Sequence, residues 1–283
     1  MARLRTTRQY IATALFFFAG AASAQMASSA DMARSYSYAD MADLALAAPI
    51  AAVVTVHDAL RLKGADAVGV PPGLVRFYIV GDVTTLIAGR DGLPTSVSWL
   101  ADVPMGAANR LPKLKKQKLI LLARGVPGKP GTLQLVSRDA QIDWSPDSEA
   151  RVRAILTEAN GVGAPPVVQD VGHAFHVPGS IPGEGETQIF LKTADSRPVS
   201  LSILRRPGED PRWSVALGEM VDDSAAAPKR DTLLWYRLAC ALPAGLPDSA
   251  VADQSPEDAA AARDDYKVVL TGLGACGRLR VQN

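Results

Sequence analysis

Length, composition and charge already narrow the classes of protein to which this chain can belong. It has 283 residues, of which 48% are hydrophobic and 6% aromatic, a composition typical of a folded protein. Its 30 basic and 29 acidic residues almost balance, whereas dedicated nucleic-acid-binding proteins usually carry a strong basic excess. We therefore expect no nucleic-acid partner, and the length predicts one large or two ordinary domains.

Residues 1–24 have the layout of a secretory signal peptide. Three arginines stand among the first eight residues, an apolar run follows at 10–20, and small residues at 22–24 form a cleavage site before Gln25. Loss of this segment removes three arginines and no acid, which leaves 27 basic and 29 acidic residues and a formal charge of about −2. The sequence therefore predicts an exported protein, in a periplasm or outside the cell.

Residues 25–48 lead from the signal peptide to the first predicted domain. They are predicted to be a flexible lead-in followed by a short helix at 39–48 that ends before Pro49. The apolar stretch at 44–56 is the longest after the signal peptide, but a bilayer-crossing helix needs roughly 20 residues, and Pro49 interrupts the stretch. No further membrane span is therefore expected.

Residues 49–144 are predicted to form a β-barrel-like module. Five strand-like segments, separated by turns rich in Gly and Pro, lie at 51–62, 74–88, 97–103, 118–124 and 133–144. The second is long and contains Gly81 at its centre, where a glycine commonly marks a bulge or a bend at a barrel corner. An OB-like barrel is one candidate for this pattern, and other five-stranded barrels and sandwiches fit it as well.

A linker helix and an α+β module complete the predicted fold, which is α+β and mostly β overall. The helix is predicted at 145–161, with Ser145 as its N-cap and Pro146 in its first turn. The module at 165–283 is predicted to contain an antiparallel sheet followed by two helices. Its predicted strands are 167–177, 187–193, 198–206 and 213–221, and its predicted helices run from Asp231 to Leu242 and from Ser255 to about Gly272.

Cys240 and Cys276 are the only cysteines of the chain, so they allow one intramolecular disulfide. Disulfides persist in the compartments that exported proteins reach, and a bridge here would attach the last predicted helix to the module. On the chain-entropy account it would stabilise the fold by about 3 to 4 kcal/mol. Two buried free thiols or a reactive pair are the alternatives, although no Cys-x-x-Cys motif supports thiol exchange.

The residues of this sequence best suited to metal binding or catalysis are Asp170, His173 and His176. A His-x-x-His pair with a nearby carboxylate can bind zinc or another divalent cation, and a single histidine can act in catalysis. The segment alternates as a strand, however, so His173 is expected on the apolar face and His176 on the opposite one. We therefore expect structural or surface histidines rather than a metal site, and no cofactor.

The sharpest charge feature is the segment 110–118. It carries five basic residues and no acidic one, namely Arg110, Lys113, Lys115, Lys116 and Lys118. On an exported protein, the anions available to this patch are lipid head groups, acidic glycans or the acidic surface of an envelope protein. The alternative is a solvated hairpin arm whose lysines protect a sheet edge from aggregation.

No catalytic signature emerges from the sequence. It contains neither the Gly-x-Ser-x-Gly nor the Ser-x-x-Lys motif of hydrolases, and its Gly-x-Gly-x-x-Gly at 272–277 follows a predicted helix instead of a strand. The interpretation that we favour is a non-catalytic exported protein that acts in binding or assembly at the cell envelope. The alternative is a periplasmic hydrolase or metal-dependent enzyme that uses His173 or His176.

Overall fold

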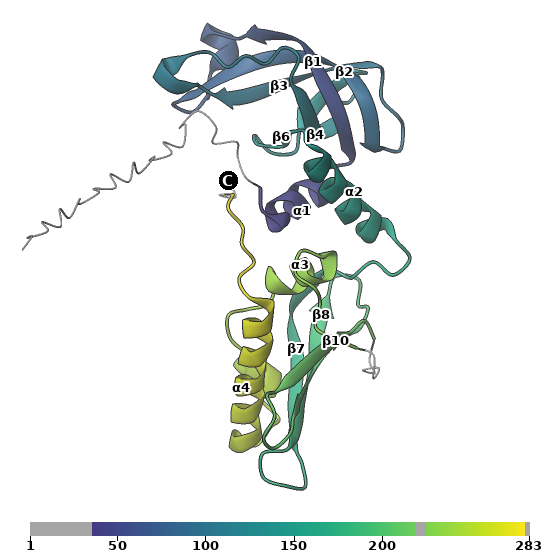
Figure 1. Ribbon diagram of the computed structural model, residues 1–283, viewed down its shortest axis with the longest axis vertical. Coiled ribbons are helices and arrows are strands. Elements are labelled where there is room, and N and C mark those ends of the chain that lie inside the picture. Colours follow the sequence, from purple (N-terminus) through teal and green to yellow (C-terminus); the bar gives the residue numbers. More distant parts are fainter. Residues whose placement is uncertain (1–35, 219–224, 281–283) are drawn as a thin grey trace, which may run out of the picture. The chain divides into compact units, whose positions relative to one another are not determined.

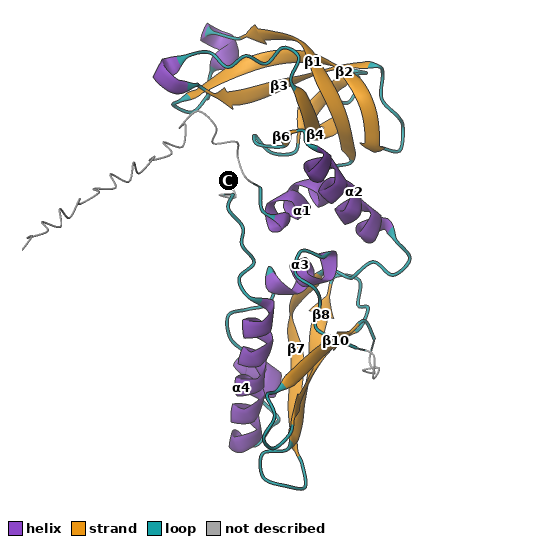
Figure 2. Cartoon of the chain, in the orientation of Figure 1, coloured by secondary structure: helices purple, strands orange, loops and turns teal. Residues whose placement is uncertain are grey.

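The computed structural model describes residues 36–218 and 225–280. The predicted signal peptide and the lead-in up to residue 35 lie outside the described residues. Within these ranges the chain forms a closed β-barrel and a separate four-stranded antiparallel sheet with helices (Figure 1), and Figure 2 marks the helices and strands by type. The predicted fold class, α+β and mostly β, is confirmed. None of the helices in these ranges has the length and apolar character needed to cross a membrane.

The first helix, α1 (Tyr38–Ala47), starts at a complete capping box. The Ser37 side chain accepts a hydrogen bond from the Asp40 N–H at 3.1 Å, and the Asp40 carboxylate accepts one from the Ser37 N–H at 3.0 Å. These reciprocal bonds satisfy two N–H groups at the helix start. Asp40 is completely buried, so its charge depends on such donors.

Five strands close the barrel in the order β1-β2-β3-β5-β4-β1, and a sixth, β6, pairs along β4. The strands are β1 (Ile50–Arg61), β2 (Leu74–Ala88), β3 (Ser96–Pro104), β4 (Lys118–Gly125), β5 (Thr132–Leu135) and β6 (Gln141–Asp143), and the short helices between them are η1 (Gly64–Ala67) and η2 (Ala107–Asn109). Neighbouring strands are antiparallel except β3 and β5, which are parallel. The predicted five-stranded barrel is confirmed, in a topology that agrees with the OB-like candidate.

The predicted strand 133–144 is two short strands rather than one. β5 and β6 pair with successive parts of β4. Between them, the Ala140 N–H donates to the Ser137 carbonyl at 3.0 Å, and the Ser137 hydroxyl donates to Asp139 at 2.6 Å. Ser and Asp favour turns because their side chains bond locally in this way, and this turn divides the predicted strand.

Gly81 lies opposite a bulge in the neighbouring strand. The pairing of β1 with β2 skips His57 at this point. A Cβ atom on Gly81 would lie 2.5 Å from Val54 Cγ1 and 3.2 Å from Trp99 Cη2. The bulge predicted near this glycine is therefore confirmed, and the glycine also leaves room for the buried indole of Trp99.

Helix α2 (Pro146–Asn160) follows β6 directly. Ser145 caps it by accepting a hydrogen bond from the Ser148 N–H at 3.0 Å, with proline in the first position as predicted. Val152 and Ile155 are completely buried, so one face of this helix packs into the core.

The second sheet is an antiparallel meander in the order β10-β9-β8-β7. Its elements are β7 (Val168–Pro178), β8 (Gly185–Thr193), β9 (Val199–Arg205) and β10 (Arg212–Ala216), followed by α3 (Leu233–Ala239), η3 (Asp248–Val251) and α4 (Pro256–Leu273). Helix α4 packs along β7 and β8 (Figure 1). Thr232 rather than Asp231 caps α3, because Asp231 adopts a left-handed conformation with φ of 61°. The predicted end of the last strand, at 219–221, lies outside the described residues.

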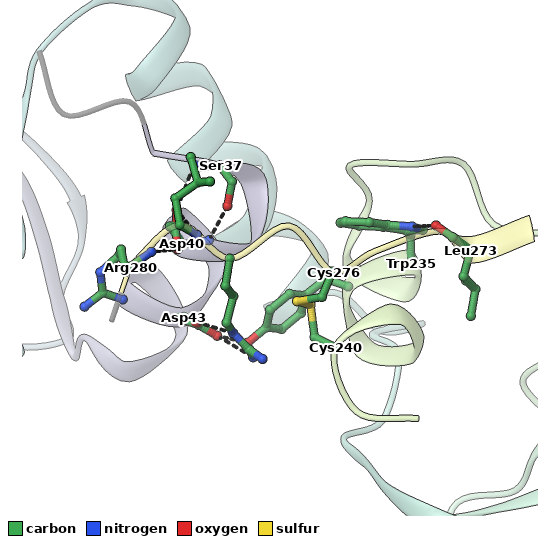
Figure 3. The surroundings of a disulfide bond; sticks show 11 residues. Ser37, Asp40, Asp43, Trp235, Cys240, Leu273, Cys276 and Arg280 are labelled. Carbon is green, nitrogen blue, oxygen red and sulfur yellow. Dashed lines mark hydrogen bonds and ion pairs between the residues drawn. A yellow bond between two sulfur atoms is a disulfide. The ribbon is translucent and has the colours of Figure 1, made fainter. Parts of the chain in front are cut away.

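A disulfide joins Cys240, at the C-terminal end of α3, to Cys276, just after α4 (Figure 3). The two Cα atoms are 4.8 Å apart. The predicted pairing is confirmed, and the free-thiol alternative is wrong.

Candidate functional site: a groove in the barrel

Strand β7 places its two histidines on the faces opposite to those predicted. The side chain of His176 is only 10% exposed, whereas His173 is exposed. The reason is a pair of irregularities in the pairing with β8, the second of them at Gly172, each of which shifts the alternation of side chains by one residue. Val171 and Ala174 are consequently both buried.

His176 belongs to a buried polar network that also includes Thr187, Asp265 and Arg205. The Thr187 hydroxyl donates to Asp265, so it accepts from His176 Nδ1, 2.8 Å away, and that nitrogen carries the proton. Arg205 forms an ion pair with the other carboxylate oxygen of Asp265. Thr187 and Asp265 are completely buried. The network therefore connects α4 to the sheet.

Asp170 is exposed and lies outside this network. Its carboxylate accepts a hydrogen bond from the Val171 N–H at 2.8 Å. Within the described ranges, no three His, Cys, Asp or Glu side chains are arranged to hold a metal ion. The structure thus does not assemble Asp170, His173 and His176 into one site.

The basic segment 110–118 is not a uniform cationic surface. Lys115 forms an ion pair with Asp58 at 2.9 Å, and Lys118 Nζ lies 3.4 Å from the centre of the Trp144 ring. The exposed members are Arg110, Lys113, Lys115 and Lys116. Two of the five cations have partners within the described part of the chain, which lowers the charge that the segment offers to an external anion.

A groove lies where β3 and β5 separate. These strands pair only at Ser98–Thr132 and Trp99–Leu133, although β3 continues to Pro104. Beyond the pair they leave a groove of about 510 Å³, a volume within the roughly 300 to 1,000 Å³ of ligand sites.

The course of the chain after β5 explains the opening. The Val136 N–H donates to the Leu122 carbonyl at 3.1 Å, so the chain continues along β4 and moves away from β3. The floor of the groove includes the buried side chains of Trp99 and Leu133. Trp99 Nε1 donates to Gln141 Oε1 at 3.0 Å, which satisfies the polar atom of the indole within the barrel.

Three exposed apolar side chains lead across the outer face of the barrel to the groove. Leu60 pairs with Tyr78, and Tyr78 pairs with Leu100, so they form a row across β1, β2 and β3. These side chains, the apolar row, are 62%, 40% and 52% exposed, respectively. Tyr78 and Leu100 also line the groove. Contiguous exposed apolar side chains of this kind mark interaction sites, whereas single ones are ordinary.

The charged side chains that line the groove leave an excess of positive charge. Arg76 donates two hydrogen bonds to Asp102, at 2.7 and 2.9 Å, so these two charges compensate each other. The bonds to Asp102 also raise the pKa of the Arg76 guanidinium. Lys129 and Arg138 line the groove as well, and neither has an ion-pair partner in the part of the chain that is described. The groove is therefore suited to an acidic ligand.

Sequence reasoning missed the groove, although one signal pointed to it. The outward positions of β3 before Pro104 are occupied by serine or aspartate, and Leu100 is the exception. Tyr78 also stands at an outward position of β2, and it is exposed. Such positions are polar on a sheet face that meets only water, so these two residues indicate a contact surface.

No protein-family model matches the chain, and no curated protein matches it at a significant level. Function must therefore be argued from the groove and its residues.

Proposed function

We propose that this protein is a non-catalytic exported binding protein of the cell envelope, and that it holds an acidic partner protein at the barrel groove. The observation that carries the proposal is the meeting of the apolar row with Lys129 and Arg138 at one groove. Desolvation of the apolar row supplies affinity, and the two cations select acidic groups and speed their approach.

Export is supported by the signal-peptide pattern at 1–24 and by the Cys240–Cys276 disulfide. A structural disulfide persists in a periplasm or outside the cell, where thiols are not kept reduced. The partner is accordingly expected among proteins of the same compartment.

The groove favours an envelope protein over the glycan or lipid head group that the charge pattern also allowed. Sugar rings bind by stacking on aromatic faces, and Tyr78 is the one exposed aromatic side chain among the groove residues. A lipid head group is held mainly by clustered cations, whereas here the cations border an apolar surface. A protein segment with both apolar and acidic side chains matches both features.

In-cell photo-crosslinking tests this proposal. A photoreactive phenylalanine analogue replaces Leu100 in the full chain, and the same analogue at Val177, an exposed apolar residue of β7, serves as the matched control. We expect a discrete crosslinked protein from position 100 and none from position 177. The yield should fall at least about tenfold in the Lys129→Glu, Arg138→Glu double variant, because both cations are reversed.

Two results would contradict the proposal. One is a set of crosslinks that forms equally from both positions or ignores the charge reversal. The other is fractionation of the chain with the cytosol, with residues 1–24 still attached.

A further inference from the structure

We infer that the partner binds by strand addition, with an extended acidic segment pairing to the open edge of β3. This inference rests on the proposed function and specifies how the partner is held. Strand β3 runs from Ser96 to Pro104, yet β5 pairs with it only at Ser98 and Trp99. The pair Trp99–Leu133 is the last one, and from Ala101 to Pro104 the edge of β3 that faces the groove has no strand partner among the described residues.

One hydrogen bond fixes which backbone groups point into the groove. The Ser98 N–H donates to the Gly131 carbonyl at 2.8 Å, so the backbone groups of Ser98 face the β5 side. Residues of a strand in an antiparallel pair direct their N–H and C=O groups to alternate edges. The backbone groups of Leu100 and Asp102 therefore face the same side as those of Ser98, and Asp102 lies beyond the last pair with β5.

An open edge of this kind is a template for another strand. Added main-chain hydrogen bonds supply affinity that does not depend on sequence, and alternate side chains of the added strand supply specificity. Side chains on its outer face would contact the apolar row beside Leu100. Carboxylates of the same segment are attracted by Lys129 and Arg138, which line the groove. The expected ligand thus alternates acidic and apolar residues.

A pair of substitutions at one position isolates the backbone contribution. Asp102→Pro and Asp102→Ala both remove the ion pair with Arg76, but only proline also removes the N–H. Because that N–H points to the groove, its loss leaves the pairing of β3 with β2 in place, and proline is tolerated at such an edge position. The difference between the two variants therefore reports the loss of the N–H together with the rigidity that the proline ring adds to the backbone.

The probe is a set of peptides selected from a displayed library of random dodecapeptides. Selection uses the full-length protein, with counter-selection on the Leu100→Glu variant, and titration calorimetry then gives the affinities. We expect selected peptides that alternate acidic and apolar residues. They should bind Asp102→Pro about tenfold more weakly than Asp102→Ala, since about one hydrogen bond is lost. Methylation of alternate peptide nitrogens should weaken binding by at least as much.

Equal affinities for Asp102→Pro and Asp102→Ala, together with tolerance of N-methylation, would overturn strand addition, and so would a selection that yields no peptide. If Asp102→Pro fails to fold, the affinities of the N-methylated peptides for the unmodified protein still test strand addition. The proposed function is tested separately. If it holds and strand addition fails, the crosslink from position 100 forms equally in both Asp102 variants. If the proposed function itself fails, that crosslink is absent from the otherwise unmodified chain.

Discussion

Arg278 forms a bidentate ion pair with Asp43, although the two residues are 235 positions apart in the sequence: Nε donates to Oδ2 at 2.7 Å and Nη2 to Oδ1 at 3.0 Å. The hydroxyl of Tyr236 also donates to Asp43. The bonds to Asp43 raise the pKa of Arg278. Two residues earlier, Cys276 is bound covalently to Cys240 (Figure 3), so the end of the described chain is held by both a disulfide and an ion pair.

The buried carboxylate of Asp40 extends this attachment. It accepts hydrogen bonds from the backbone N–H groups of Leu279 and Arg280, each at 3.1 Å, while it also completes the capping box of α1. Asp40 is completely buried, and such a charge is stable only when donors surround it. The backbone of the segment after Cys276 thus supplies the hydrogen bonds that water would otherwise donate to this carboxylate (Figure 3).

We predict that Arg278→Ala destabilises the protein by about 1 to 3 kcal/mol, because the Asp43 side chain is only 12% exposed and would lose a charged donor. Urea unfolding at pH 7 measures the change. Arg110→Ala, at an exposed arginine, is the control and should change stability by less than about 0.5 kcal/mol. Equal effects of the two substitutions would show that the ion pair contributes nothing.

The lowered pKa of the Asp139 carboxyl makes the stability of the fold depend on pH. Burial disfavours its charged form, but hydrogen bonds from Arg280 and Ser137 outweigh burial and lower its pKa from 3.8 to about 2. A carboxyl whose pKa is lower in the folded state stabilises the fold above its unfolded pKa. This stabilisation is therefore complete above about pH 4 and disappears as the pH falls through about 2.

We expect Asp139→Asn to lower the free energy of unfolding by about 2 kcal/mol at pH 6, and the difference from the unmodified protein to shrink steadily toward pH 2. Urea unfolding at a series of pH values tests this. In an Arg280→Ala background, Asp139→Asn should have little effect at any of these pH values, because the main charged donor is already absent. A difference that stays constant from pH 6 to pH 2.5 would refute the prediction.

Local signals predicted most of the elements, because capping acts within a few residues. Ser145 with Pro146, and Ser255 with Pro256, predicted the first turns of α2 and α4, and both helices begin at those prolines. Strand β2 has the predicted bounds for a related reason, since glycine- and proline-rich turns limit it on both sides.

Local sequence patterns could not predict the features that depend on strand pairing. The irregularity at Gly172 reverses the expected faces of His173 and His176, and its place depends on the register with β8. The glycine itself was a hint, since a Cβ there would lie 3.1 Å from the Phe190 carbonyl oxygen. The groove has a similar origin, because it depends on where β5 leaves β3 to follow β4. Leu100 marks the surface in the sequence, but only the three strands together create the opening.

The barrel interior is packed so closely around Gly81 that it leaves no room for a side chain there. Gly81→Ala should destabilise the protein by about 1 to 3 kcal/mol, because the new Cβ would lie 2.5 Å from Val54 Cγ1 and would press on the Trp99 indole. Gly163→Ala is the matched control, since a Cβ there meets nothing within 4 Å. Thermal unfolding followed by tryptophan fluorescence compares the two. A Gly81→Ala protein as stable as the control would mean that the barrel relaxes around the added methyl group.

Substitutions of Thr187 test how much the buried network around α4 contributes to the stability of the fold. Thr187→Val keeps the shape of the side chain but leaves His176 Nδ1 without its acceptor and one oxygen of Asp265 without its threonine donor. We expect a loss of about 2 to 4 kcal/mol, since both groups stay buried. Thr187→Ser keeps the hydroxyl and removes one methyl group, so it should cost only about 1 kcal/mol. Chemical denaturation at pH 7 distinguishes the variants. If valine is tolerated as well as serine, packing rather than hydrogen bonding holds α4 against the sheet.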